Sequence, residues 1–530
     1  MSLARTPPAP EGRAPRPTAR GRALVVAIVG LALAGCRTEP PRATTVIGTT
    51  PGGLTMQPCM HRDSIPAECG TLTVPERRDV AGSRLIAIPV IRIRARGATP
   101  GLPIFFLNGG PGGTNQRTRP PEWSRDTHDF VLVGFRGVDG SERLACPEFE
   151  QSLATSIGDL LSARAIADRR AATDRCASRL RRDGVDLVGY TMHEVVDDMD
   201  AAREALGIDR LLLYSESYGT RLAQIYAHRH REHVARSVMV GVNPPGRFIW
   251  EAAQLDTVLL EYGRLCTQDP ACRANTPDLP AAVSRVVHDM PTRWGPFPIH
   301  RGVVLLAAFQ LLFSQESAPL VLDAFVDADQ GDASGLAALS LVAGYQLTQF
   351  DLVFGDMFAK GSVDFDSVRG RPEAFDPPGS IMGAPMSSVF WTAVTASGGW
   401  PIVRPADHAA TTPASDVETL LIGGTLDVST PAVYARRELL PQLSRGHQVI
   451  FRNAGHNDLW EFQGDAYARL VGGFFASGAV DTTGFASQSI SLHGTWTLAL
   501  LAKLVVAAGV LLLATLAFGG WKLSRRLRRT

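Results

Sequence analysis

Apolar residues along this chain gather in short runs that end at glycine-rich turns. The first two such segments, residues 69–75 and 84–93, alternate apolar and polar positions, which predicts an opening antiparallel pair of strands. The later runs are continuously apolar, a pattern typical of strands buried on both faces. They occupy residues 102–107, 129–135, 211–214, 235–242, 418–422 and 447–451.

Segments with helical periodicity lie between several of these strands. Residues 191–206 place apolar side chains on one side and charged side chains on the other, and Gly207 ends the predicted helix. Further helices are predicted at residues 220–230 and 459–475. Strands that alternate with helices imply a mostly parallel sheet covered on both faces.

The alternation breaks off over residues 243–400, a span too long for a simple connection in a compact sheet. Helical periodicity returns within it at residues 254–265, 303–313 and 320–329, which predicts an inserted, largely helical cap domain. Between residues 247 and 376, carboxylates outnumber Lys and Arg by about two to one, which favours attraction of cationic ligands.

The N-terminal segment has the features of a secretory signal. Several arginines precede an apolar run at residues 23–35, which is short for a membrane span but suits the hydrophobic region of a signal peptide. The run ends in Leu33-Ala34-Gly35-Cys36, which resembles a bacterial lipobox, where the cysteine becomes the lipid-modified N-terminus. The alternative is a plain signal peptide whose cleavage removes Cys36.

A second hydrophobic segment lies near the C-terminus, at residues 504–520. Trp496 and Lys503 precede it, and Trp521 and a run of arginines follow it. This arrangement is typical of a transmembrane helix whose C-terminus lies in the cytoplasm. The protein is therefore predicted to be exported and anchored in the cell membrane, with its globular body in the bacterial periplasm or at the cell surface.

A chain of 530 residues with 45% hydrophobic positions can bury a large core and hold more than one folding unit. The patterns above divide it into predicted segments. In order, these are a signal peptide with a candidate lipobox (1–36), a linker (37–58), the first part of the α/β core (59–242), the cap insertion (243–400), the second part of the core (401–476), a linker (477–495), a transmembrane helix (496–521) and a basic cytoplasmic tail (522–530).

Composition excludes several classes of function. The net charge of +1 argues against a nucleic-acid-binding protein, which would normally present a concentrated basic face. The sequence contains neither a zinc-type spacing of Cys and His nor a phosphate-binding loop of the G-x-x-x-x-G-K-[ST] type. We expect neither a cofactor nor a metal ion.

The cysteines other than Cys36 fall into pairs that are close in sequence, and an even number in an exported protein indicates disulfides. Buried free thiols are the alternative, and other pairings are compatible with the sequence. The predicted pairs are Cys59–Cys69, Cys146–Cys176 and Cys266–Cys272.

Three residues with catalytic chemistry follow predicted strands. Ser217 lies in the turn SESYG between a strand and a helix, Asp427 follows the strand at residues 418–422, and His456 follows the strand at 447–451. Ligand sites of open α/β sheets lie at this edge, and the order Ser, Asp, His is that of α/β hydrolases. Each residue alone is also compatible with an ordinary turn or loop residue, but together they predict a catalytic triad.

Upstream, the strand at residues 102–107 runs into the glycine-rich loop Asn108-Gly109-Gly110-Pro111-Gly112-Gly113. This loop is similar to the H-G-G-P-G loop of the prolyl-iminopeptidase and tripeptidyl-aminopeptidase group of serine peptidases. The segment RGVDGS at residues 136–141 resembles the R-G-x-G-x-S segment of that group, and SESYGT at 215–220 resembles its G-E-S-Y-G-T elbow. The resemblance extends over residues 72–475, with three departures: Asn108 for His, Asp139 for Gly and Ser215 for Gly.

The resemblance implies an α/β-hydrolase fold and an aminopeptidase that releases N-terminal residues or short peptides from a peptide substrate. The backbone N–H groups of Tyr218 and Gly110, or Gly109 in place of the latter, would form the oxyanion hole. A carboxylesterase acting on small esters is the alternative, because the same triad serves both reactions. A binding protein without catalysis is a third hypothesis, which the intact triad disfavours.

Overall fold

The computed structural model describes residues 48–530 except 348–351, 367–369, 396–397, 487–489 and 529–530. The predicted signal segment and Cys36 lie outside the described residues, as does the first half of the linker predicted at 37–58.

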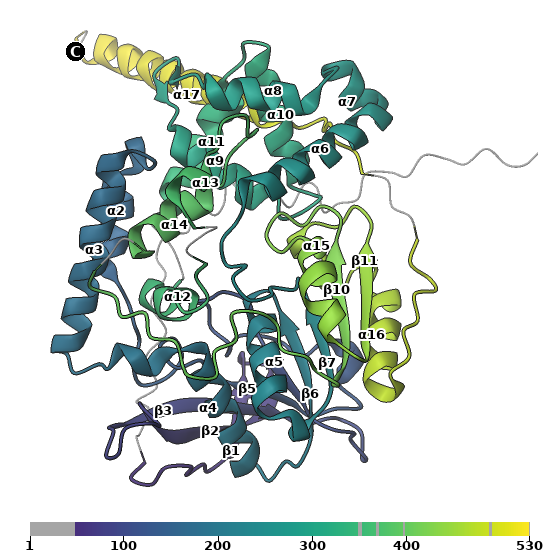
Figure 1. Cartoon of the computed structure of the whole chain (residues 1–530). Coiled ribbons are helices and arrows are strands. Elements are labelled where there is room, and N and C mark those ends of the chain that lie inside the picture. Colours follow the sequence, from purple (N-terminus) through teal and green to yellow (C-terminus); the bar gives the residue numbers. More distant parts are fainter. Residues whose placement is uncertain (1–47, 348–351, 367–369, 396–397, 487–489, 529–530) are drawn as a thin grey trace, which may run out of the picture. The chain divides into compact units, whose positions relative to one another are not determined.

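The core of the fold is a nine-stranded sheet with the order β1-β2-β3-β5-β4-β6-β7-β10-β11 (Figure 1). The first pairs, up to β3–β5, are antiparallel, and every pair from β5–β4 onward is parallel. The predicted α/β-hydrolase fold is thus confirmed. The strands are β1 Gln57–His61, β2 Ile65–Pro75, β3 Leu85–Ile93, β4 Ile104–Leu107, β5 Phe130–Val133, β6 Leu211–Glu216, β7 Val234–Val240, β10 Glu418–Gly424 and β11 Gly446–Phe451.

Helices cover both faces of this sheet because the parallel strands are apolar on both sides. The helices α4 (Met192–Ala205) and α5 (Tyr218–Arg229) bury one face, where Leu213 and Phe105 lie in the same apolar cluster as Leu222. The helix α16 (Asp465–Ser477) buries the other, with Phe474 packed among Leu212 and Tyr214. The loops at the carboxyl edge of the parallel strands therefore rest on a core that is covered on both sides.

The segment between β7 and β10 is largely helical and is called the cap below. Its helices α6, α8, α9, α10 and α11 enclose an apolar cluster of their own. The cap elements are α6 Ala252–Gln268, α7 Pro270–Asn275, α8 Leu279–His288, the hairpin β8 Arg293–Trp294 and β9 Phe297–Pro298, α9 Arg301–Leu311, α10 Ala318–Asp329, α11 Ser334–Gln346, α12 Phe354–Gly361, α13 Pro372–Phe375 and α14 Pro385–Thr395.

Two helices that the periodicity did not reveal lie between β5 and α4. They are α2 (Pro147–Thr155) and α3 (Ala163–Arg182), and α3 packs against the cap helix α14 (Figure 1). A disulfide joins Cys146, at the start of α2, to Cys176 of α3. The other two predicted pairs, Cys59–Cys69 and Cys266–Cys272, are also bonded.

Two predicted helix boundaries need correction. The last core helix begins at Asp465 rather than at residue 459, because Glu461 and Gln463 have positive φ angles of 57° and 54° that no helix accommodates. The C-terminal helix α17 spans Leu498–Leu527 and continues into the predicted basic tail. Within the described chain, it is the one helix long and apolar enough to cross a membrane.

Candidate active site

Ser217 occupies a sharp turn between β6 and α5. Its φ of 51° and ψ of −122° are strained for a residue with a side chain, and the strain fits the backbone bend of a nucleophile elbow. The Ser217 N–H donates to the carbonyl of Val240 at 2.8 Å, and the Thr220 hydroxyl donates to the Ser217 carbonyl at 2.6 Å. These bonds hold the turn on the edge of the sheet with Ser217 half-buried.

The neighbours of Ser217 explain the sequence of the elbow. A Cβ atom on Gly219 would lie 2.1 Å from the carbonyl oxygen of Leu107, so only glycine fits where the elbow meets β4. Ser215 replaces the usual glycine of the motif, yet its side chain is fully buried and donates to the carbonyl of Val238 at 3.2 Å. The departure at Ser215 therefore leaves the elbow intact.

The structure brings the three predicted triad residues together. His456 Nε2 lies 3.1 Å from Ser217 Oγ, and His456 Nδ1 lies 3.0 Å from Asp427 Oδ2. With Asp427 ionised, this geometry assigns the proton to Nδ1 and leaves Nε2 free to accept the proton of the Ser217 hydroxyl. The arrangement is that of a nucleophile, a base and a residue that orients the base.

Asp427 is held as a carboxylate by several donors. Its oxygens accept from the N–H groups of Ser429 and Thr430, each at 2.8 Å, and from the Thr430 hydroxyl at 2.7 Å. Burial acts to raise the pKa of Asp427, but its interactions with His456 and Thr430 outweigh burial, and the pKa lies below its ordinary value. Sequence reasoning did not identify Thr430, which the turn after β10 places against both triad partners.

The glycine-rich loop lies beside the nucleophile. A Cβ on Gly109 would approach Ser217 Cβ to 3.2 Å, and the Gly109 N–H donates to Asn108 Oδ1 at 2.8 Å. Because that N–H is engaged, the geometry favours Gly110 over Gly109 as the partner of Tyr218 in an oxyanion hole. Asn108, which replaces the usual histidine, also donates to the Thr114 carbonyl at 2.7 Å and so braces the loop from within.

Asp139, the other departure from the family motifs, has a structural role. Its carboxylate accepts from the N–H groups of Asn115 at 3.0 Å and Phe135 at 2.9 Å. Asn115 in turn donates to the carbonyls of Phe106 and Val133. Asp139 thus ties the glycine-rich loop to strands β4 and β5.

The cap supports the glycine-rich loop from the other side. The Val353 N–H, just before α12, donates to the carbonyl of Gly112 at 3.0 Å. One helical turn further, Asp356 and Lys360 form a fully buried ion pair, and Lys360 Nζ donates to the carbonyl of Arg136 at 3.1 Å. Burial raises the pKa of Asp356 to about 6 and lowers the pKa of Lys360.

The cap also holds the loop that carries His456. The Asn457 N–H donates to the carbonyl of Phe313 at 2.7 Å, and the Phe313 ring lies 5.1 Å from the His456 ring. Asp458 Oδ1 accepts from the Ser314 hydroxyl at 2.8 Å. Its Oδ2 accepts from the N–H groups of Gln315 at 2.8 Å and Gly455 at 2.7 Å. No local sequence signal pointed to the contacts of Asp458 with the cap, because Ser314 and Gln315 come from a distant segment.

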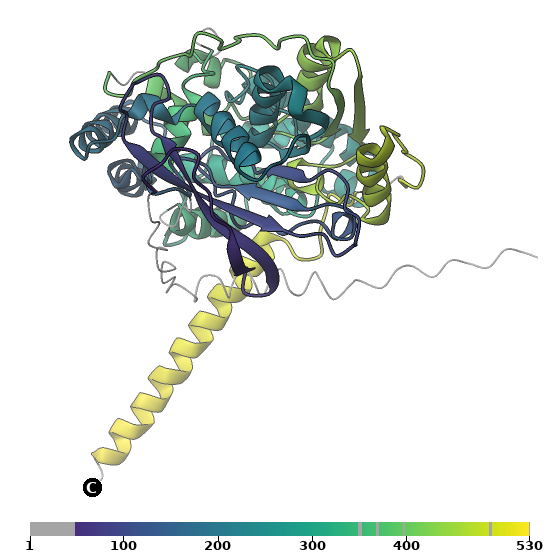
Figure 2. The same cartoon turned by 90° about the horizontal axis from the view of Figure 1, so that it is seen from below.

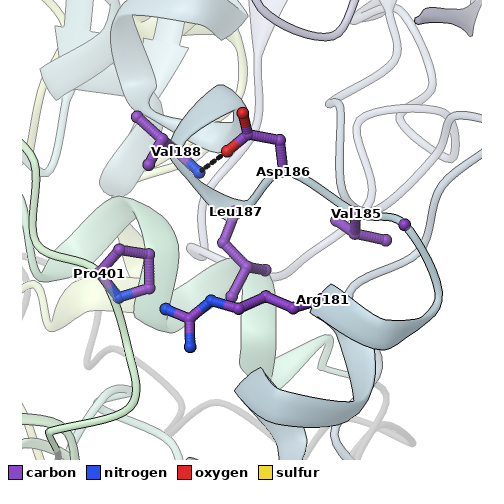
Figure 3. Close-up of a pocket in the computed structure, with 7 residues that line it drawn as sticks. Arg181, Val185, Asp186, Leu187, Val188 and Pro401 are labelled. Carbon is purple, nitrogen blue, oxygen red and sulfur yellow. Dashed lines mark hydrogen bonds between the residues drawn. The ribbon is translucent and has the colours of Figure 1, made fainter.

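A surface hollow of about 370 Å³ lies elsewhere, between the end of α3 and the turn that precedes α4 (Figure 3). Its lining includes Arg181, Leu187 and Pro401, and no triad or glycine-loop residue. Over the described ranges, no group of three or more His, Cys, Asp or Glu side chains is placed to hold a metal ion.

Two family models match the chain. One, described as the alpha/beta hydrolase fold, covers residues 103–263, and the other, described as TAP-like protein, covers residues 384–487. The first range contains Ser217, and the second contains Asp427 and His456.

Named relatives share parts of the chain. The tripeptidyl aminopeptidase of Streptomyces coelicolor is 29% identical over 213 residues, which are 38% of this chain and 39% of that protein. Serine protease Hip1 of Mycobacterium tuberculosis is 26% identical over 295 residues, covering 50% of this chain and 55% of that protein. The proline iminopeptidase of Neisseria meningitidis is 24% identical over 156 residues, which are 29% of this chain and 37% of that protein. The match thus spans less than two thirds of the length of each relative.

Proposed function

Because the chain belongs to the α/β hydrolases, in the group of the tripeptidyl aminopeptidases and proline iminopeptidases, we propose that it is a serine aminopeptidase. It would release N-terminal residues or short peptides from oligopeptides outside the cytoplasm. The observation that carries the proposal is the continuous chain from Ser217 Oγ through the His456 ring to Asp427, with distances of 3.1 and 3.0 Å.

The proposed reaction begins with attack of Ser217 Oγ on the scissile carbonyl while His456 Nε2 takes the hydroxyl proton. Asp427 stabilises the imidazolium that forms. The N–H groups of Tyr218 and Gly110 face the developing oxyanion. His456 then returns the proton to the leaving amine, and afterwards it activates the water that hydrolyses the acyl-enzyme.

A fluorophosphonate probe tests the nucleophile directly. The full-length protein should be labelled on Ser217, and Ser217→Ala should abolish both labelling and turnover of tripeptidyl arylamides. Ser215→Ala is the matched control, because Ser215 lies in the same elbow but is buried away from the triad. Unchanged hydrolysis by purified Ser217→Ala would refute the assignment.

Substrate class is tested by comparing aminoacyl and tripeptidyl arylamides with short-chain esters. Turnover of arylamides that have a free N-terminus, with loss of turnover when that amine is acetylated, supports the aminopeptidase. Turnover of esters alone would instead identify a carboxylesterase.

We also propose that α17 anchors the enzyme in the cell membrane. It is a 30-residue helix that is exposed along most of its length, with Trp521 and several arginines at its far end. The three disulfides fit an oxidising compartment for the globular body. Retention in the membrane fraction after an alkaline carbonate wash is expected, and release into the supernatant would contradict the anchor.

A further inference from the structure

The first turns of α17 are fastened to the cap. The Ser334 hydroxyl, at the start of α11, donates to the carbonyl of Ala499 at 3.4 Å, and Lys503 forms an ion pair with Asp332. Just before the helix, His493 Nδ1 lies 2.8 Å from a carboxylate oxygen of Asp323 on α10. The beginning of α17 is therefore part of the cap surface, while its far end runs clear of the other elements (Figure 2).

The ion pair between Lys503 and Asp332 determines how close the cap lies to the bilayer. The apolar stretch from Leu504 to Trp521 measures about 27 Å as a helix, slightly less than the hydrocarbon core of a bilayer at about 30 Å. All of that stretch is needed to span the membrane, so Lys503 must lie at the edge of the hydrocarbon. Its partner Asp332 immediately precedes α11, and α11 therefore begins at the level of the lipid headgroups.

The surface at this level is apolar and rich in aromatic side chains. The helix α11 contains no charged residue between Ser334 and Gln346, yet Leu341 is 63% and Tyr345 is 46% exposed. A helix facing water would normally carry charges on that face. The helix packs against α17 and also contacts the hairpin β8–β9, which carries the stacked Trp294 and Phe297 rings.

We propose that this surface, formed by the outer face of α11, the β8–β9 hairpin and Trp496, lies on the bilayer and contacts lipid at the boundary between headgroups and acyl chains. The proposal rests on the membrane anchoring proposed above. A lipid surface fits better than a protein partner because the face is continuous with α17, and because Trp496, 55% exposed, and Tyr345 are residue types that favour this boundary. The cap, rather than the sheet, would then be the part of the enzyme held against the membrane.

Quenching by brominated lipids tests the proposal on the full-length protein in phosphatidylcholine nanodiscs. The variants Leu341→Cys and Tyr345→Cys each carry a bimane label on the introduced cysteine. Leu512→Cys, in the middle of α17, is the positive control. Ile450→Cys is the negative control because it is 40% exposed on the edge strand β11. Labels at 341 and 345 should lose at least about half as much fluorescence as the label at 512, and the label at 450 almost none.

The outcomes distinguish failure of the lipid-facing surface from failure of the membrane anchor α17. Strong quenching at 512 with none at 341 and 345 leaves the anchor standing and overturns the lipid-facing surface. Absence of quenching at 512 refutes the anchor and the surface together. Cross-linking of Leu341→Cys between two copies, without quenching by lipid, would assign this face to a second copy of the chain and would also overturn the proposal.

Discussion

Asp458 is the residue whose replacement best tests how the cap controls catalysis. Its carboxylate accepts three hydrogen bonds, from the Ser314 hydroxyl and the Gln315 N–H of the cap and from the Gly455 N–H next to His456. Asp458→Ala removes all three and leaves two N–H groups without their acceptor. Hydrogen bonds to a charged group contribute about 1.5–3 kcal/mol each and are not additive, so we expect the free energy of unfolding to fall by about 3 kcal/mol.

The effect on rate follows from the position of His456. Loss of the bonds to Ser314 and Gln315 leaves the loop tied to the cap chiefly through the Asn457 N–H. The loop can then shift, and a displacement of about 1 Å at a reacting group can lower the rate about 100-fold. We therefore expect kcat on a tripeptidyl arylamide to fall about 30- to 100-fold, which corresponds to about 2–2.7 kcal/mol of transition-state stabilisation, with a smaller change in KM.

Two further variants test whether Asp458 positions His456. Asp458→Asn keeps an oxygen for both N–H groups and can donate to Ser314 Oγ, so it should retain most of kcat. Asp278→Ala is the control for stability alone, because Asp278 caps α8 through the Ala281 N–H at 3.1 Å, away from the triad. If Asp458→Ala lost stability but kept kcat within about threefold of wild type, the cap would not position His456.

Four other substitutions have defined outcomes. Gly219→Ala should abolish soluble expression or lower the melting temperature by more than about 10 °C, because its Cβ would lie 2.1 Å from the Leu107 carbonyl. Ser215→Gly, measured by arylamide kinetics, should keep kcat/KM within about twofold, since it restores the usual motif. Gly455→Ala places a Cβ 2.6 Å from the Phe313 carbonyl and should lower kcat by at least about tenfold in the same assay. Burial raises the pKa of Glu216 to about 8 from 4.5, so the folded state loses stability as pH rises between these values. Glu216→Gln should therefore melt like wild type at pH 4.5 and higher than wild type at pH 8.5 in calorimetry, and equal melting at pH 8.5 would contradict the assignment.

The sequence predicted the sheet and the proximity of Ser217, Asp427 and His456 because both depend on local patterns. Strands with continuous apolar runs, the turn at Ser217 and the order of the three residues are visible without knowledge of distant contacts. The helix α3 was missed because its buried stripe is made largely of small residues such as Ala165 and Ala172, which give weak contrast with the charged positions.

No comparable local sequence pattern predicts the contacts between the cap and the loops that carry Gly112 and His456. Asp458 and Ser314 are 144 positions apart, and each is an ordinary polar residue in its own segment. The start of α16 was placed too early for a similar reason, since the positive φ angles at Glu461 and Gln463 are set by packing rather than by propensity.

The two backbone hydrogen bonds that the cap makes at the reaction centre limit how the enzyme can work. One joins Val353 to Gly112 of the glycine-rich loop, and the other joins Phe313 to Asn457, the residue after His456. A cap that opened as a rigid lid would break both bonds and release the glycine-rich loop and the His456 loop. We therefore expect the cap to stay in place during turnover. If the cap contacts the substrate, we expect a substitution that reshapes it to shift the Gly112 and His456 loops as well, and so to change rate together with specificity.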